Sequence, residues 1–228
     1  MEFLVSSFAA ALRLIGSFSP DVVDAVRTSL SVAAGATVFA ALFGVPVGIA
    51  VGLTDSRLSG VAVVALNTLM AAPTVVVGLL VYGFLSRQGP LGALGLLFTP
   101  TAIVIGGTLL ASPIVANYTL ASVRGADPRI LPTARTLGAG RFRAAATLVG
   151  EIRFGVFAAV IAGFGRVVAE VGVAMMLGGN IRGYTRTMTT AIALETSKGE
   201  FSFGMALGIV LMTVALIVNL FLSLLQRR

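Results

Sequence analysis

The feature that most constrains this sequence is a set of long stretches without any charged residue. They are residues 28–54, 58–86, 88–123 and 201–226. A helix that crosses the hydrocarbon core of a bilayer needs about 20 mostly apolar residues, so each stretch is long enough to cross. With 57% hydrophobic and 11% charged residues, the chain also departs from the composition of water-soluble domains. The sequence therefore predicts an integral membrane protein.

A fifth stretch, residues 154–179, is also long enough to cross but carries two charges. The predicted fold is therefore all-α: a polytopic membrane bundle of about five transmembrane helices, forming a single domain over residues 1–228. The candidate spans are Asp24–Leu53, Ser59–Leu85, Phe98–Val123, Arg153–Leu177 and Phe203–Leu225. Because so small a bundle encloses a central pathway more easily with a second copy, we expect a homodimer.

The first residues form a separate and shorter apolar segment. Leu4, Phe8, Leu12 and Ile15 recur at helical spacing. We expect residues 2–17 to form a short amphipathic helix that lies in the membrane interface. A sixth span is the alternative, although the run is short for a crossing.

The arginines favour one orientation in the membrane. The connection between the third and fourth candidate spans, about residues 124–153, holds six arginines and only two acidic residues. Because basic loops stay in the cytoplasm, this loop is predicted to be cytoplasmic. The turn around Arg57 and the terminal Arg227 and Arg228 then fall on the same side. We expect a multi-pass protein of the inner or plasma membrane, with its N-terminus outside and its C-terminus in the cytoplasm.

Several residues inside the spans are candidates for a pathway or gate. Pro46, Pro73 and Pro113 each remove a backbone hydrogen bond that lipid cannot replace, which suits helices that line a path. Passive kinks are the alternative. Asn67 and Asn117 place amides at membrane depth, where joining helices by hydrogen bonds is the commoner role and binding a ligand the rarer one. Asn67, Pro73 and Pro113 are retained as candidate pathway residues.

A pair of opposite charges lies inside the fourth candidate span. Arg166 and Glu170 are four residues apart, so on a helix they share a face and can pair. Pairing reduces the cost of placing two charges in the membrane, and ionisable groups at this depth commonly mark functional sites. A role in gating or the pathway competes with a purely structural role. Residues 177–201 that follow are rich in glycine and hydroxyl side chains, and we expect an external loop with a short helix there.

What the sequence lacks excludes several functions. It contains no cysteine and no histidine, so disulfides, thiol chemistry and the usual zinc sites are not expected. Its only lysine, Lys198, is not part of the Gly-x-x-x-x-Gly-Lys loop that cradles phosphates, so ATP must be hydrolysed elsewhere. The net charge of +7 comes from arginines that flank apolar spans, which does not indicate nucleic-acid binding.

The basic loop is predicted to be helical on both sides of a glycine-containing turn. It reads RGADPRILPTARTLGAGRFRAAATLVGEIRFG. Gly138 and Gly140 permit a sharp turn, so the loop can present two short helices at an angle below the membrane. That shape suits docking into a groove of another protein. A solvated basic loop beside anionic lipids is the alternative.

This loop resembles the coupling segment of ATP-binding cassette importer permeases. The family pattern is Glu-Ala-Ala, three residues, Gly, nine residues, then Ile-x-Leu-Pro. Residues Pro132-Thr133-Ala134 and Gly138 align with its first part, whereas Leu148-Val149-Gly150-Glu151 departs from its end. Nearly the whole chain resembles the tungstate branch of the molybdate, sulfate and tungstate permeases. The runs that carry this likeness are LNTLMAAPTVVVGLLVY, GPLGALGLLFTPTAI, ARTLGAGRFRAAATLVGEIRFG and AEVGVAMMLGGNIRGYTRTMTTAIALETSKGEF.

The resemblance implies a division of labour among several subunits. Two copies of a non-catalytic permease without a cofactor would carry an oxyanion, tungstate first and molybdate or sulfate as alternatives. Two cytoplasmic ATPase subunits would bind ATP and Mg²⁺, and an external binding protein would deliver the cargo. The residues expected to couple the permease to the ATPase are Thr133, Ala134, Arg135, Gly138, Ala139 and Arg141. Two other classes stay open: an ion-coupled secondary transporter with Glu170 as the titrating group, and a membrane-embedded enzyme, for which the chain offers few acid–base groups.

Overall fold

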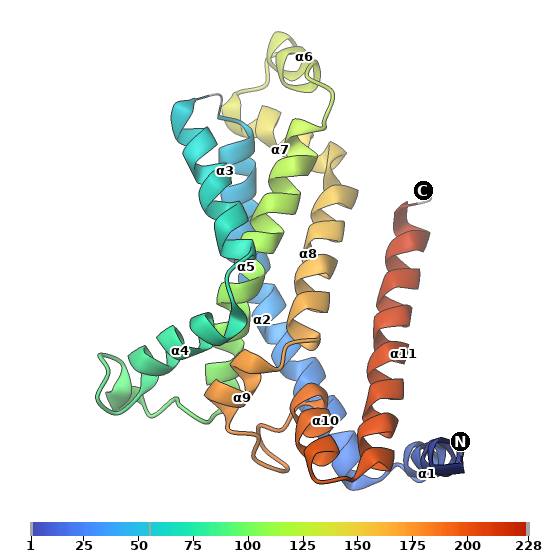
Figure 1. Cartoon of the computed structure of the whole chain (residues 1–228). Helices are drawn as coiled ribbons and strands as arrows, with labels where there is room; N and C mark the ends of the chain where they lie inside the picture. The colour runs from blue at the N-terminus through green and yellow to red at the C-terminus, as the bar shows by residue number, and fades with distance from the viewer. Residues whose placement is uncertain (1, 55, 227–228) are drawn as a thin grey trace.

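The computed structural model describes residues 2–54 and 56–226, and its long elements there are helices (Figure 1). In chain order they are α1 (Glu2–Gly16), α2 (Pro20–Gly52), α3 (Arg57–Met70), α4 (Thr74–Leu85), the 3-10 turn η1 (Gly92–Leu94), α5 (Pro100–Arg124), α6 (Ile130–Thr136), α7 (Arg141–Glu151), α8 (Arg153–Val168), α9 (Gly172–Gly178), α10 (Met188–Ser197) and α11 (Phe201–Gln226). The predicted all-α fold class is confirmed.

Three of the five candidate spans are single long helices, as predicted. The helices α2, α5 and α11 are each long and apolar enough to cross a membrane. A proline occupies the first turn of both α2 and α5, where a missing N–H costs nothing. The Thr99 hydroxyl accepts a hydrogen bond from the N–H of Ala102 and so caps the start of α5. Pro46 and Pro113 lie inside α2 and α5 without ending either helix.

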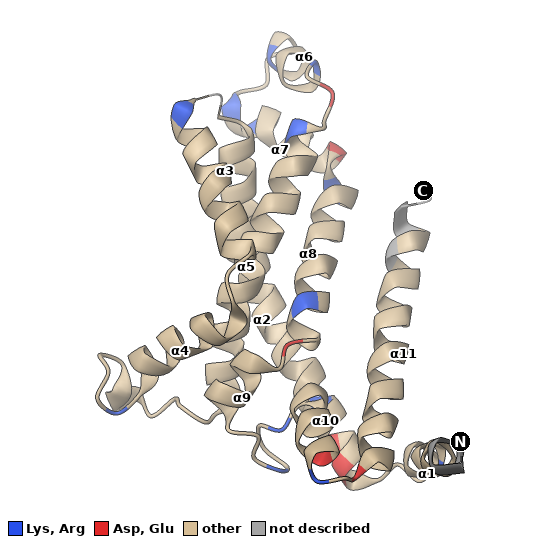
Figure 2. Ribbon diagram, viewed as in Figure 1, with Lys and Arg blue, Asp and Glu red and all other residues tan. Residues whose placement is uncertain are grey.

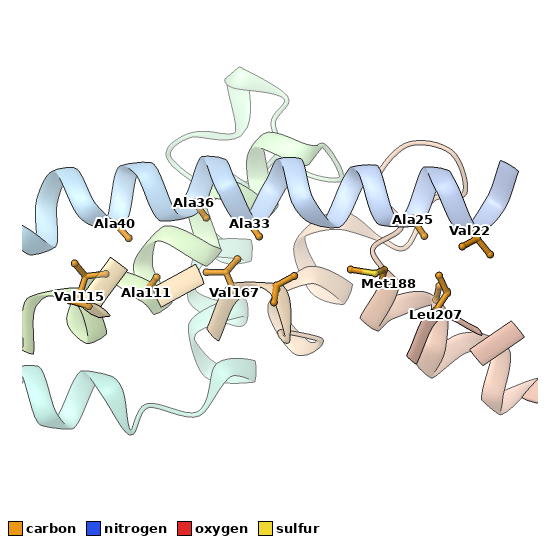
Figure 3. Close-up of a cluster of buried hydrophobic side chains, with 13 residues drawn as sticks. Val22, Ala25, Ala33, Ala36, Ala40, Ala111, Val115, Val167, Met188 and Leu207 are labelled. Carbon is orange, nitrogen blue, oxygen red and sulfur yellow. The ribbon is translucent and has the colours of Figure 1, made fainter. Parts of the chain in front are cut away.

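The helices α2 and α5 form the centre of the bundle, and α8 packs against both. Glycines let the backbones of α2 and α5 approach closely. A Cβ added at Gly44 would lie 2.8 Å from the carbonyl oxygen of Ser112, and one added at Gly48 would lie 2.4 Å from that of Ala116. Figure 3 shows small side chains from the two helices facing each other at this contact: Ala33, Ala36, Ala40, Ala111 and Val115.

The second candidate span, Ser59–Leu85, is wrong as a continuous helix. The helix α3 ends at Met70, α4 begins at Thr74, and the two axes differ by 94°. Pro73 explains the break, because it has no N–H to continue α3 and its φ of −60° suits the start of α4. Residues 71–73 form a first joint, and α4 points sideways, away from the long helices (Figure 1).

The fourth candidate span, Arg153–Leu177, is interrupted as well. The helix α8 has 16 residues and ends at Val168, and the short α9 begins at Gly172. Residues 169–171 form a second joint, so Glu170 lies beyond the helix that carries Arg166. Hydropathy does not reveal this break because the residues on both sides of it are apolar.

The connections gather at two opposite ends of the bundle. At one end lie α6 and α7, toward which the last turns of α11 also point, and at the other lie α1, α10 and the start of α2 (Figure 1). Most charged residues lie in the ribbon near these two ends, as Figure 2 shows. The expected positions of Arg227 and Arg228 lie outside the described residues.

The helix α1 lies across one end of the bundle rather than alongside the long helices (Figure 1). It packs on α11 and buries Ser7 and Ala11. Phe8 and Leu12 remain about half exposed, at 49% and 50%. An apolar ridge left open on a short transverse helix fits the expected interfacial position; the side chain of Leu4 lies outside the described ones.

Candidate functional site

Arg166 and Glu170 form an ion pair across the second joint. Arg166 Nη1 lies 2.6 Å from Glu170 Oε2. The predicted pairing is therefore confirmed, although the expectation that both residues share one helix is wrong. The Glu170 side chain is only 6% exposed, whereas that of Arg166 is 36% exposed. The Arg166 side chain is thus partly exposed, whereas that of Glu170 is buried.

Glu170 is also fixed by contacts to two neighbouring segments. Its Oε1 accepts a hydrogen bond of 3.2 Å from the N–H of Val173, near the start of α9. Its backbone carbonyl accepts one of 2.7 Å from the Thr189 hydroxyl, in the first turn of α10. A single residue therefore connects α8, α9 and α10, and its carboxylate cannot move without losing the bonds from Arg166 and Val173.

The two joints lie side by side. A Cβ added at Gly172 would lie 3.1 Å from Thr74 Oγ1 and 3.3 Å from Glu170 Oε1, so the start of α4 adjoins the ion pair. Further along, a Cβ added at Gly78 of α4 would lie 3.0 Å from the Met176 sulfur of α9. The structure thus brings the joint formed by Pro73 next to the Arg166–Glu170 pair, a proximity that their separation in the sequence concealed.

A small cavity with a mixed polar and apolar lining adjoins Glu170. Its volume is about 10 Å³, room for about one water molecule. Its polar lining comes from Ser29, Glu170, Thr187 and Thr189. Ser29 accepts a hydrogen bond of 2.6 Å from the N–H of Met188 and so attaches α10 to α2. Sequence reasoning missed Ser29, because a lone serine in an apolar span gives no signal of its partner.

Among the described residues, no hydrogen bond links Asn67 or Pro113 to the Arg166–Glu170 pair. The Asn117 amide on α5 donates hydrogen bonds to the Asn67 carbonyl oxygen on α3 and, at 3.0 Å, to the Met70 sulfur. The two asparagines thus connect helices, which was the commoner of the two roles weighed for them. Pro113 is buried inside α5.

At the opposite end, α6 and α7 form a projecting pair of short helices (Figure 1). Gly138 between them has a φ of +85°, a left-handed conformation that favours glycine. Gly140 precedes the first residue of α7. The predicted turn between two short helices is confirmed.

The predicted coupling residues lie around this turn. Thr133, Ala134 and Arg135 are in α6, Gly138 and Ala139 form the turn, and Arg141 begins α7. Ala134 faces inward and is 9% exposed.

Two apolar side chains project from the same turn. Leu137 and Phe142 are 82% and 84% exposed. Between α6 and α7 opens a cavity of about 610 Å³, lined among others by Thr133, Leu137 and Thr147. Exposed apolar residues beside a cavity are suited to contact another protein. Sequence reasoning missed Leu137 and Phe142 because helical periodicity does not show which apolar side chains lack a neighbour.

The approach to α6 is fixed by a local ion pair. The Asp127 carboxylate accepts a hydrogen bond of 2.9 Å from the backbone N–H of Arg129 and lies 2.7 Å from its guanidinium. The hydrogen bonds from Arg129 lower the pKa of Asp127 below its usual value. Asp127 is therefore charged at neutral pH and orients the entry to α6.

At the other end of the bundle, ion pairs order the segment predicted as a loop with a short helix. Arg182 Nε donates to Asp21 Oδ1 at 2.6 Å, which ties the segment to the start of α2. Arg186 and Lys198 both pair with Glu195, at 3.3 Å and 3.0 Å. The predicted short helix is α10, and it packs on α11.

A solved structure shares this arrangement of helices. It is titled as the crystal structure of an amino acid ABC transporter with histidines, and it matches with a TM-score of 0.70 over 94% of this chain and 96% of that chain. The identity is 19%, so this likeness shows the fold alone. Long apolar helices around a charged joint, with a short helix pair projecting at one end, define the class as a polytopic helical membrane protein.

Sequence comparison gives the family. The profile of the binding-protein-dependent transport system inner membrane component matches residues 44–228, and the chain belongs to this family. It is 38% identical over 219 residues to the tungstate uptake system permease protein TupB of Peptoclostridium acidaminophilum, covering 96% of both chains. It is 37% identical to TupB of Campylobacter jejuni, covering 100% of this chain and 95% of that one. The molybdenum transport system permease protein ModB of Azotobacter vinelandii is 32% identical over 214 residues, covering 87% and 92%.

Several predictions from the resemblance are thereby confirmed. The chain is a permease subunit of an ATP-binding cassette importer and not an enzyme. Its place is a multi-pass position in the inner membrane, and its family works with a separate ATPase and a substrate-binding protein. The relatives named for tungstate and molybdenum bear out the likeness to that branch.

Proposed function

We propose that this chain carries a tetrahedral oxyanion across the membrane, tungstate first and molybdate or sulfate second. The observation that carries the proposal is the similarity to permeases named for tungstate uptake, which extends over 96% and 100% of this chain. The partly exposed Arg166 within a largely apolar span supports it, because a guanidinium presents several N–H donors to a tetrahedral anion.

The path for the anion runs beside the two joints. Arg166 contacts the oxyanion, Glu170 holds that arginine, and Pro73 gives α4 the freedom to tilt at its joint. Asn67 and Pro113 border the path on α3 and α5 without contacting the ion pair. The cargo binds weakly along this path, because a tight site would trap it.

A second copy of the permease completes the path. The Arg166 side chain is 36% exposed inside a candidate membrane span, and lipid would be a costly neighbour for it. A homodimer with Arg166 facing the central axis provides protein and water around the charge instead. Each copy forms a single permease domain over residues 1–228.

Coupling to ATP occurs at the end that carries α6 and α7. Two ATPase subunits, which bind ATP and Mg²⁺, receive residues Thr133, Ala134, Arg135, Gly138, Ala139 and Arg141 in their grooves, and the exposed Leu137 and Phe142 add apolar contact. When nucleotide draws the ATPases together, α6 and α7 move with them and the bundle switches its opening as a rigid body. This end lies in the cytoplasm with the C-terminus, and the N-terminus lies outside.

Reconstitution tests the proposal directly. The permease, its ATPase and its binding protein in sealed vesicles should accumulate tungstate only when ATP is supplied. An ATPase variant without its phosphate-binding lysine is the control and should give no uptake. Tungstate movement driven by an ion gradient without any ATPase would instead indicate a secondary transporter, and absence of oxyanion uptake under all conditions would refute the proposed cargo.

A further inference from the structure

The two partners of the Arg166–Glu170 pair differ in how many contacts hold them, and an ion pair with a purely structural role does not require this difference. The carboxylate is buried and held by Arg166, by the Val173 N–H and through the backbone by Thr189. The guanidinium uses only Nη1 in this pair, and its other N–H donors have no hydrogen-bond partner among residues 2–54 and 56–226. Glu170 is therefore held in place, whereas Arg166 keeps N–H donors that are available to a ligand.

We propose that Glu170 is a built-in counter-ion of Arg166 that sets how tightly the permease holds an oxyanion in transit. This inference rests on the proposed function, in which Arg166 contacts the cargo. Glu170 acts as a positioning and tuning residue, since it contacts the arginine and not the anion.

Charge explains why such a counter-ion is needed. The apolar stretches 28–54, 58–86, 88–123 and 201–226 hold no charge that could balance a lone guanidinium. An unpaired arginine in this setting would bind a dianion through charge-assisted hydrogen bonds that are hard to break. The fixed carboxylate 2.6 Å away brings the net charge of the pair to zero. The open donors can then still orient an oxyanion, but the attraction that would trap it is reduced.

The anchoring of Glu170 makes this device independent of the cargo. Because the Val173 N–H holds the carboxylate and Thr189 holds the backbone of the same residue, the carboxylate stays in place when an anion approaches the guanidinium. The arginine can divide its donors between the two anions and return to Glu170 when the cargo leaves. A carboxylate on a flexible exposed side chain would be repelled and lose this effect.

The test is the Glu170→Gln variant, which keeps the shape and an oxygen acceptor but removes the charge. It is assembled with its ATPase, and equilibrium binding of tungstate is measured without the binding protein, together with ATP-driven uptake. We expect tungstate affinity to rise by about tenfold or more while maximal uptake falls by a similar factor. Glu200→Gln, the same change at an exposed position beside the start of α11, is the matched control and should alter neither quantity.

Two further variants make the result decisive. Arg166→Gln/Glu170→Gln removes both charges and should lose the gain in affinity. Glu170→Asp keeps the charge but draws it back from Arg166, and should show a smaller gain, which provides a test if Glu170→Gln does not assemble.

The outcomes separate the two proposals. Unchanged affinity in Glu170→Gln or in an assembled Glu170→Asp would overturn the counter-ion role, as would a fall in uptake without tighter binding. If the wild-type complex takes up no tungstate or molybdate at all, the proposed function fails instead.

Discussion

The contact between α2 and α5 and the pair of joints beside α4 and α9 are stabilised in opposite ways. At the first, small residues let two long helices touch, with a virtual Cβ at Gly48 only 2.4 Å from the Ala116 carbonyl oxygen. At the second, helices stop, and Arg166, Glu170 and Thr189 are joined by hydrogen bonds and charge. Shape complementarity fixes one arrangement, whereas polar contacts can be exchanged for others. The comparison indicates a rigid centre and an adjustable side in one small bundle.

The largest expected effect comes from a methyl group placed in the rigid centre. Gly48→Ala puts a Cβ against backbone that cannot move aside, so we expect a loss of about 3 kcal/mol of stability and little folded protein in membranes. Gly60→Ala in α3 is the matched control, because nothing lies within 4 Å of its added Cβ. Thermal unfolding of the detergent-extracted protein measures the difference. Equal stability of the two variants would contradict the close contact.

A second change separates steric crowding from backbone conformation. Gly138 has open space around it but a φ of +85°. Gly138→Val should therefore leave the bundle folded, distort the turn at a cost of about 1–2 kcal/mol, and reduce both ATPase co-purification and uptake by about tenfold. Gly140→Ala, where φ is −66°, should be tolerated. Normal co-purification and uptake in Gly138→Val would show that this turn is not the coupling element.

A third change weakens a polar contact away from the joints. Asn117→Leu removes the hydrogen bonds that connect α5 to Asn67 and Met70 of α3. Such interhelical bonds contribute on average about 0.6 kcal/mol, so a small fall in the unfolding midpoint is expected, with uptake largely retained. A complete loss of uptake in a folded variant would instead place Asn117 on the path and extend the adjustable side of the bundle to α5.

The smallest effect is expected at the exposed Asp127–Arg129 pair. Because the folded state lowers the pKa of Asp127, its contribution is present above the usual carboxyl pKa of about 4 and is lost only as the pH falls through the lower folded value. Asp127→Asn should thus change ATPase binding only slightly, and by the same amount across about pH 5.5 to about pH 8, because Asp127 stays charged throughout that range. A strong pH dependence of ATPase binding in this range would assign the titration to another group.

The sequence predicted the helices better than it predicted their interruptions. Long uncharged runs determine α2, α5 and α11, because lipid leaves the chain few other choices. The joint at Pro73 was within reach of sequence reasoning, since a proline in mid-span either bends a helix or ends it. The joint at Glu170 was not, because the residues around Glu170 continue the apolar pattern and the contacts of Glu170 with Val173 and Thr189 cannot be read from that pattern.

The sequence predicted the two charged residues of the candidate site but not the residues that surround them. Spacing alone indicated that Arg166 and Glu170 pair. Which of the two is buried, and that Thr74 and Ser29 lie nearby, depends on contacts between segments far apart in the chain. A hydrophobic pattern carries no information about such neighbours.

The shortness of α8 has a consequence for the energy barrier to the ion. Its 16 residues span about 24 Å, less than the hydrocarbon thickness of about 30 Å. Beyond Val168 the chain continues as the joint of residues 169–171 and the short helix α9, beside the hydroxyls of Thr187 and Thr189. In the proposed path, the apolar stretch along α8 is therefore shorter than the bilayer, which lowers the cost of dehydrating the ion, and Arg166 lies near one end of that stretch.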